Sequence, residues 1–203
     1  MPNFARSMLV ACAALGFAAT ALAQTAPPTR IRGTIEAVNG RTLAIDTREG
    51  KKVSVQMADP ATVLAVKRAD RSSISPGAFV GIAAEPDAQG KLRAQEVLVF
   101  PENMRGTGEG QYGWDLTPKS NMTNGTVKTA KQGGGEQYLE LTYKNAEANI
   151  AVPPDVPVVT LVPAEWSDLK PGEKVFLGAT KKPDGEFTAS RIIVGKNGVA
   201  PPM

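Results

Sequence analysis

Histidine is absent from the 203 residues, and the single cysteine is Cys12, near the N-terminus. Serine–histidine and cysteine–histidine pairs, and zinc sites with imidazole or thiolate ligands, are therefore excluded from the chain after its leader. Aromatic residues are only 5% of the sequence. Neither a phosphate-binding P-loop nor an acidic loop with calcium-binding spacing occurs. We expect no enzyme activity, no catalytic residues, no metal site and no cofactor.

The chain also lacks a large excess of charge of either sign. The chain has 23 basic and 20 acidic residues, for a formal net charge of +3, and no basic block stands out. Proteins that bind nucleic acid concentrate Lys and Arg in a patch or stripe, with aromatic platforms where single strands bind. We therefore expect no nucleic-acid partner.

The N-terminal residues have the pattern of a secretory signal peptide. Arg6 precedes an apolar run from Met8 to Leu22, and Ala21 and Ala23 are the small residues that a signal peptidase reads. We expect residues 1–23 to be removed near Ala23, leaving a periplasmic or secreted protein without disulfides. A lipoprotein modified at Cys12 is the less favoured alternative. No later run approaches the roughly 20 apolar residues of a transmembrane helix, so no transmembrane span is expected.

Most of the remaining chain consists of two similar sequence repeats. Gly33-Thr34-Ile35 returns as Gly125-Thr126-Val127, and Pro76-Gly77 returns as Pro171-Gly172. Gly90 returns as Gly185, with the same offset of 95 residues that relates 76 to 171. Each copy alternates apolar and polar residues between Pro and Gly turns, which is typical of short strands and hairpins. No long helical period occurs.

The pattern predicts an all-β protein of two tandem OB-like barrels, with five to six strands each. Curling each small sheet into a barrel removes its exposed edges. The expected divisions are a signal peptide at 1–23, an extended leader at 24–30, a first OB-like barrel at 31–101, a Gly-rich aromatic linker at 102–121, a second OB-like barrel at 122–196 and a flexible C-terminus at 197–203.

The linker is the one segment without a repeat partner. Glycines at alternate positions let backbone amides approach a ligand closely, and its aromatic rings can stack on a sugar or a partner surface. We take as candidate binding residues Arg105, Glu109, Tyr112, Trp114 and Asp115, with the glycines Gly106, Gly108 and Gly110. Alternatively, the linker threads between the barrels and Trp114 holds them together.

Met104 and Met122 flank the linker and are candidate soft ligands for copper, although methionines more often fill cores.

The order Gly33-Thr34-Ile35, Thr42 to Thr47, Gly50 to Val55, Ser75 to Val80 and Gly90 to Val97 resembles a bacterial family of small exported β-barrels described as a domain of unknown function. The run from Met104 to Gly110 resembles a signature of its two-barrel members. The resemblance implies a periplasmic OB-like protein without an established activity. Members often have a histidine after the glycine run, where this chain has Gln111.

Together these features favour a non-enzymatic binding or interaction module of the bacterial envelope, with the linker as recognition segment. An envelope protein or a glycan is the expected partner, and the oligomeric state stays open. The alternative is a structural spacer or accessory subunit of an envelope complex, without a small ligand. A carboxylate-dependent hydrolase or a copper binder is the third reading.

Overall fold

A computed structural model of the chain describes residues 28–201. The expected signal peptide, its cleavage near Ala23 and the lipoprotein alternative at Cys12 lie outside these residues. The strands of the described chain are, in order, β1 (Thr29–Asn39), β2 (Thr42–Thr47), β3 (Lys52–Arg68), β4 (Phe79–Pro86), β5 (Leu92–Val99), β6 (Gly110–Gly113), β7 (Asn121–Gly133), β8 (Glu136–Tyr143), β9 (Ala146–Val152), β10 (Val158–Pro163), β11 (Lys174–Lys181) and β12 (Phe187–Val194).

The helical elements that accompany these strands are 3-10 turns of three residues each: η1 (Arg71–Ser73), η2 (Glu102–Met104) and η3 (Trp166–Asp168). The expectation of an all-β chain is confirmed. Within residues 28–201, no helix has the length and apolar character needed to cross a membrane.

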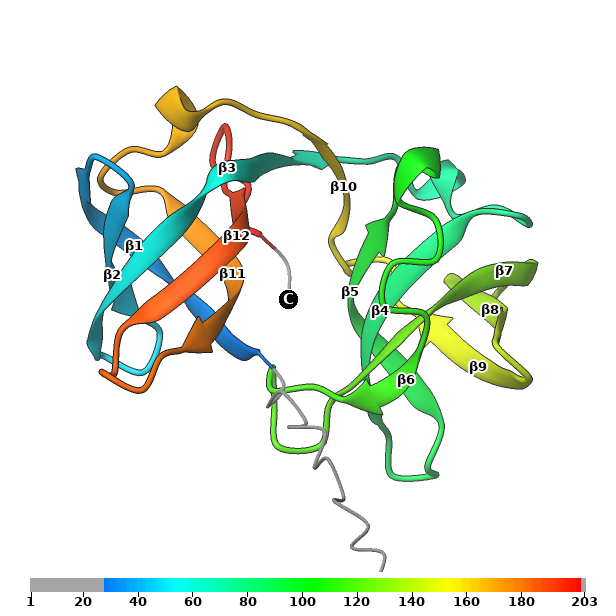
Figure 1. Cartoon of the computed structure of the whole chain (residues 1–203). Coiled ribbons are helices and arrows are strands. Elements are labelled where there is room, and N and C mark those ends of the chain that lie inside the picture. Colours follow the sequence, from blue (N-terminus) through cyan, green and yellow to red (C-terminus); the bar gives the residue numbers. More distant parts are fainter. Residues whose placement is uncertain (1–27, 202–203) are drawn as a thin grey trace, which may run out of the picture.

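Five strands close into a barrel, which we call the first ring. β1 pairs with β2 and β11, β2 pairs with β3, and β11 pairs with β12. A parallel pairing of β12 with β3 closes the circuit. The first ring lies on the left in Figure 1. Its core contains the fully buried side chains of Leu43, Ile45, Val55, Leu177 and Ile192.

The strands on the right in Figure 1, which we call the second ring, pair in the same pattern. β7 pairs with β8 and β4, β8 with β9, and β4 with β5, while a parallel contact between β5 and β9 completes the circuit. A separate apolar cluster lies inside, with Ile82, Val97, Leu139, Leu141 and Ile150 among its buried members.

The two sequence repeats exchange strands between the rings. The first ring takes β1–β3 from the first repeat but β11 and β12 from the second. The second ring takes β7–β9 from the second repeat but β4 and β5 from the first. Neither the range 31–101 nor the range 122–196 therefore closes a ring with its own strands.

The exchange follows an approximate two-fold relation between the repeats. The end of β3, from Leu64 to Arg68, pairs antiparallel with β10. At the centre of this pairing Val66 lies opposite Leu161, its own repeat equivalent at an offset of 95 residues. The parallel contacts are equivalent in the same way: Val158 pairs with Val97, and Ile192 pairs with Val63. The strands β3 and β10 thus join the rings like a self-complementary dimer interface within one chain.

A third apolar cluster fills the space where the rings meet. Its buried members are Val66, Leu98, Val159, Leu161 and Ile193, which come from both repeats. Half-buried Phe100, Met104 and Phe176 pack against it. The rings are therefore joined by a packed interface as well as by backbone hydrogen bonds, and one side of this interface opens into the candidate site.

Two repeat-equivalent glycines allow the rings to close tightly. A Cβ atom on Gly33 would lie 2.3 Å from the Asp46 carbonyl oxygen, and one on Gly125 would lie 2.6 Å from that of Thr142. Each glycine is followed by a bulge in its strand, between Ile35 and Ala37 or between Val127 and Thr129. Bulges increase the twist of a strand, which a small closed sheet requires.

Candidate functional site

The linker runs from η2 through β6 across the open side between the rings (Figure 1). β6 pairs with the start of β7, so Gly110 to Gly113 belong to the edge of the second ring. Gly106, Gly108 and Gly110 all have positive φ angles. A Cβ atom on Gly108 would approach Asn124 Nδ2 to 3.0 Å and the Tyr112 hydroxyl to 3.2 Å. The close packing of these two side chains therefore depends on Gly108.

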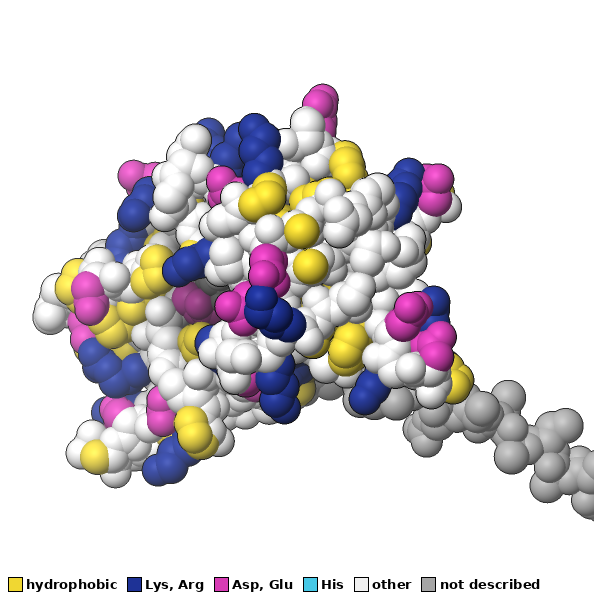
Figure 2. All heavy atoms as spheres, turned by 90° about the vertical axis from the view of Figure 1, so that its left-hand side faces the viewer, with side chains coloured by type: hydrophobic (Ala, Val, Ile, Leu, Met, Phe, Trp, Pro, Cys, Tyr) yellow, Lys and Arg dark blue, Asp and Glu magenta, His cyan; other side chains and the backbone are white. Residues whose placement is uncertain are grey.

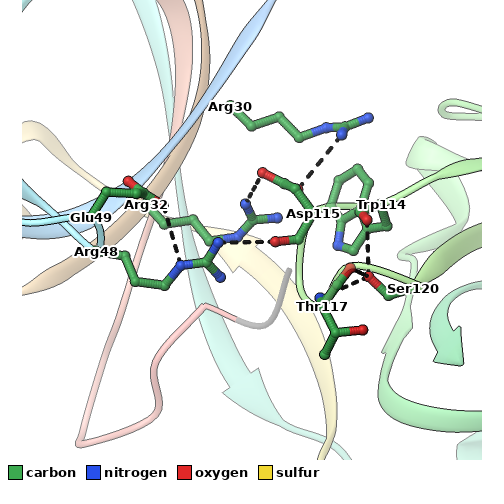
Figure 3. A network of polar contacts seen from close by, with 8 residues as sticks. All are labelled: Arg30, Arg32, Arg48, Glu49, Trp114, Asp115, Thr117 and Ser120. Atoms are coloured by element: carbon green, nitrogen blue, oxygen red, sulfur yellow. Dashed lines mark hydrogen bonds and ion pairs between the residues drawn. The ribbon is translucent and has the colours of Figure 1, made fainter.

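Beyond β6 the linker contacts β1 of the first ring, as Figure 3 shows. Arg32 Nη1 donates to Asp115 Oδ2 at 2.7 Å, and Arg30 Nη1 lies 3.6 Å from Asp115 Oδ1. Arg48 Nη2 donates to the Asp115 carbonyl oxygen at 2.9 Å. Partial burial raises the pKa of the Asp115 carboxyl, but the hydrogen bond and charge of Arg32, with Arg30, outweigh burial and hold the pKa below its ordinary value.

Trp114 lies within a group of aromatic and cationic side chains. The Arg30 guanidinium carbon is 4.0 Å from the centroid of the indole, and that of Arg32 is 5.3 Å away. The rings of Tyr112 and Phe176 each lie 6.1 Å from it, centroid to centroid. The sheet strand β11 supplies Phe176, so Trp114 connects the linker with two strands of the first ring. Its Nε1 atom is buried and has no hydrogen-bond partner among the described residues.

A pocket of about 590 Å³ opens between the rings, beside this group. Its apolar wall comes from both rings and the linker and comprises Pro60, Leu98, Phe100, Met104, Tyr112, Trp114, Met122, Leu161, Phe176, Leu177 and Ile193. Such a volume and such an apolar lining are typical of pockets that bind small molecules.

Asn124 is the buried polar residue of this pocket, with 5% of its surface exposed. Its Nδ2 atom donates to the Thr107 carbonyl oxygen at 3.0 Å and to the Tyr112 hydroxyl at 3.2 Å. Its Oδ1 atom lies over Gly81, another lining residue, and has no hydrogen-bond partner among the described residues. Burial raises the pKa of Tyr112, partly offset by Arg30, so its phenol is protonated at neutral pH.

The structure brings only some of the sequence-predicted residues to the pocket. Tyr112, Trp114 and Gly108 line the pocket, whereas Asp115 fastens the linker to β1. Arg105 does not line it: it donates to both carboxylate oxygens of Glu102 and to the Gly77 carbonyl oxygen. Glu109 accepts the backbone N–H of Lys144 at 2.8 Å. Gly106 and Gly110 shape the linker backbone without lining the pocket.

Sequence reasoning missed the residues that the strands bring to the pocket, chiefly Asn124, Phe176 and Arg191. Asn124 and Arg32 each precede the glycine that opens a repeat, so a polar residue stands at the same position of both repeats. That shared position was the available signal.

Both candidate copper ligands, Met104 and Met122, line the pocket. Elsewhere in residues 28–201, no three His, Cys, Asp or Glu side chains gather as a metal site would require. Figure 2 shows a face of the molecule on which Lys and Arg are interspersed with Asp and Glu. This mixed face lacks the basic stripe that phosphate backbones select.

Residues 32–97 match a protein family described as a domain of unknown function (DUF5666). The sequence resemblance to such a domain is confirmed over this range. The range begins in β1 and ends in β5, so it contains strands of both rings. No curated protein and no solved structure gives a significant match to the chain.

Proposed function

We propose that the protein is an exported, non-enzymatic binding module of the bacterial envelope, and that a small molecule binds in the pocket between the rings. We further infer that the rings are two OB-like barrels whose last two strands are exchanged between the repeats. The repeat-equivalent pairings support the second statement. Export rests on the leader pattern of residues 1–23.

The observation that carries the binding proposal is a pair of buried polar atoms without partners, Trp114 Nε1 and Asn124 Oδ1, on two residues that line one apolar pocket. Leaving a buried donor or acceptor unpaired costs about 1–3 kcal/mol. A ligand that moves the covering side chains enough to reach these atoms, and that supplies an acceptor to the indole and a donor to the amide, would recover that cost. The surrounding aromatic and aliphatic wall would bury the apolar part of the ligand.

Binding is tested with a neutral fluorescent probe, N-phenyl-1-naphthylamine, which brightens in apolar surroundings. We expect saturable binding with one site per chain. Thr62 is exposed and lines the pocket, so Thr62→Phe places a ring in the opening and is expected to weaken probe binding by about ten-fold or more.

The matched control is Thr180→Phe. Thr180 is also an exposed strand threonine of the first ring, but it does not line the pocket. We expect it to bind the probe like the wild type. Equal binding by all three proteins, or no saturable binding by the wild type, would refute the pocket as a binding site.

A structural spacer is the second candidate, because Arg30, Arg32 and Arg48 all hold Asp115 and so fix the linker to the first ring. In that case the linker orients the rings for a protein partner and needs no ligand. Affinity capture from envelope extract separates the two functions. If the protein is a spacer, the Thr62→Phe variant captures the same partner as the wild type. If capture depends on a ligand in the pocket, the variant does not capture that partner.

A further inference from the structure

The charges around the pocket indicate the kind of ligand. Among its lining residues, Arg191 carries the one formal charge, and no Asp or Glu is present. Arg191 follows a bulge in β12 and lies opposite Thr62 of β3 at the pocket opening. It is exposed, and its guanidinium has no hydrogen bond or ion pair among residues 28–201.

The layer behind the wall is also positive. Arg30 and Arg32 stack on the Trp114 ring, and they share one carboxylate, that of Asp115. In the pocket lining itself, Arg191 supplies a positive charge that no lining carboxylate offsets. This balance attracts an anion and repels a cation, most strongly where the apolar wall excludes water.

We infer that the ligand is an amphipathic carboxylate, an inference that rests on the proposed binding function. Its carboxylate pairs with the Arg191 guanidinium, whose fork of N–H donors matches the two carboxylate oxygens. Its acyl or aryl body lies against Phe100, Phe176 and Leu161. The Trp114 indole N–H and the Tyr112 hydroxyl, which accepts from Asn124 and keeps its own proton, are the neutral donors near this path.

The test compares three probes with one apolar chain: octanoate, 1-octanol and octylammonium. Isothermal titration of the whole chain at low salt is expected to give binding in the order octanoate, octanol, octylammonium. A charge-assisted hydrogen bond corresponds to an advantage of octanoate over octanol of about 10- to 100-fold, and this advantage decreases as salt is added.

Arg191→Gln is expected to remove the preference for octanoate over octanol, whereas Arg191→Lys retains part of it. Arg68→Gln is the matched control, because Arg68 is an exposed β3 arginine that does not line this pocket. Wild-type protein that binds octanol as tightly as octanoate, or Arg191→Gln that keeps the preference, overturns the inference.

Failure of the inference is distinguishable from failure of binding itself. If the neutral probe N-phenyl-1-naphthylamine binds in a manner sensitive to Thr62→Phe while the octanoate preference is absent, the pocket binds ligands but does not select carboxylates. If neither that probe nor octanoate binds, the proposed function and the inference both fall.

Discussion

Single atoms decide how closely the strands of each ring approach one another. Gly33 and Gly125 occupy equivalent positions in the two repeats, and in both cases a neighbouring carbonyl oxygen takes the place of a Cβ atom. Because backbone atoms cannot yield as a flexible side chain can, a methyl group at either position must displace a strand. The glycines are therefore requirements of ring closure.

Gly33→Ala and Gly125→Ala are each expected to lower the free energy of unfolding by about 2 kcal/mol or more, the range of overpacked sites. Urea unfolding followed by circular dichroism measures the change. Gly113→Ala is the control, since a Cβ atom there meets nothing within 4 Å and its φ is not positive. A loss at Gly113 equal to that at Gly33 would contradict the explanation by close approach.

Asp115 gives a prediction about pH. Its pKa is lowered in the folded protein, so its contribution to stability is present above the unfolded pKa and is lost as the pH falls through the folded pKa. Asp115→Asn is expected to lower the free energy of unfolding at pH 7, by about 1 kcal/mol or less for such partly exposed pairs. At pH 2 the difference from the wild type is expected to be close to zero.

Urea midpoints at the two pH values measure this difference. Asp155→Asn is the control, because Asp155 is exposed and has no hydrogen bond or ion pair among residues 28–201. A gap between wild type and Asp115→Asn that is unchanged at pH 2 would show that the arginine contacts contribute nothing through charge.

At the scale of elements, β3 and β10 hold the rings together. β3 has 17 residues and belongs to the first ring along most of its length, but its end pairs with β10, which in turn pairs with β5 of the second ring. Val66, at the centre of that pairing, is 1% exposed and does not line the pocket. Disturbing it therefore weakens the joint without touching the proposed site.

Val66→Ala removes two buried carbon atoms, so it is expected to lower the free energy of unfolding by about 2 kcal/mol. Probe binding per folded molecule should be unchanged. Lys67→Ala, one residue further along the strand and exposed, is expected to stay within about 0.5 kcal/mol of the wild type. Two separate unfolding transitions in Val66→Ala would show that the rings are stable independently of the joint.

At the scale of the whole molecule, the exchange of strands makes each half incomplete. Residues 28–101 contain three strands of the first ring and two of the second, and residues 102–201 contain the rest. Each half alone exposes the apolar faces that its missing strands cover. We expect both fragments to be largely unfolded or associated when separate, and to form a stable one-to-one complex with the native spectrum when mixed.

Size-exclusion chromatography and circular dichroism of the separate and mixed fragments test this expectation. A fragment of residues 28–101 that folds as a stable monomer would show that one repeat can close its own barrel. The exchange would then be a feature of the full chain and not a need of each repeat.

The strands and the hairpin turns were predictable because each depends on residues close together in the sequence. The exchange of strands between the repeats was not predictable, because a ring closed by the repeat's own strands and a ring closed by the other repeat's strands use equivalent contacts. Val63 pairs with Ile192 of the other repeat. Val97, at the equivalent position of its own repeat, has a similar β-branched side chain. The local sequence pattern indicates which strand faces are apolar, but it does not indicate which of the two repeats supplies the strands that cover them.

The same limit applies to the candidate site. Tyr112 and Trp114 were predictable from an unrepeated aromatic linker, and both line the pocket. Arg105 and Glu109 belong to the same linker, but each is engaged by a neighbouring group, Arg105 by Glu102 and Glu109 by the Lys144 amide. Asn124 and Arg191 reach the pocket only through long-range pairing of β7 and β12, which the sequence does not reveal.

The pairing of Val66 with its repeat equivalent Leu161 has a consequence for how the stability of the protein depends on its concentration. Two unlinked copies of such a unit would meet by diffusion, and their folded fraction would fall as they were diluted. Covalent fusion makes the encounter a first-order event with an effective concentration set by the tether. The thermal midpoint of the fused protein should accordingly be the same in nanomolar and in micromolar solution.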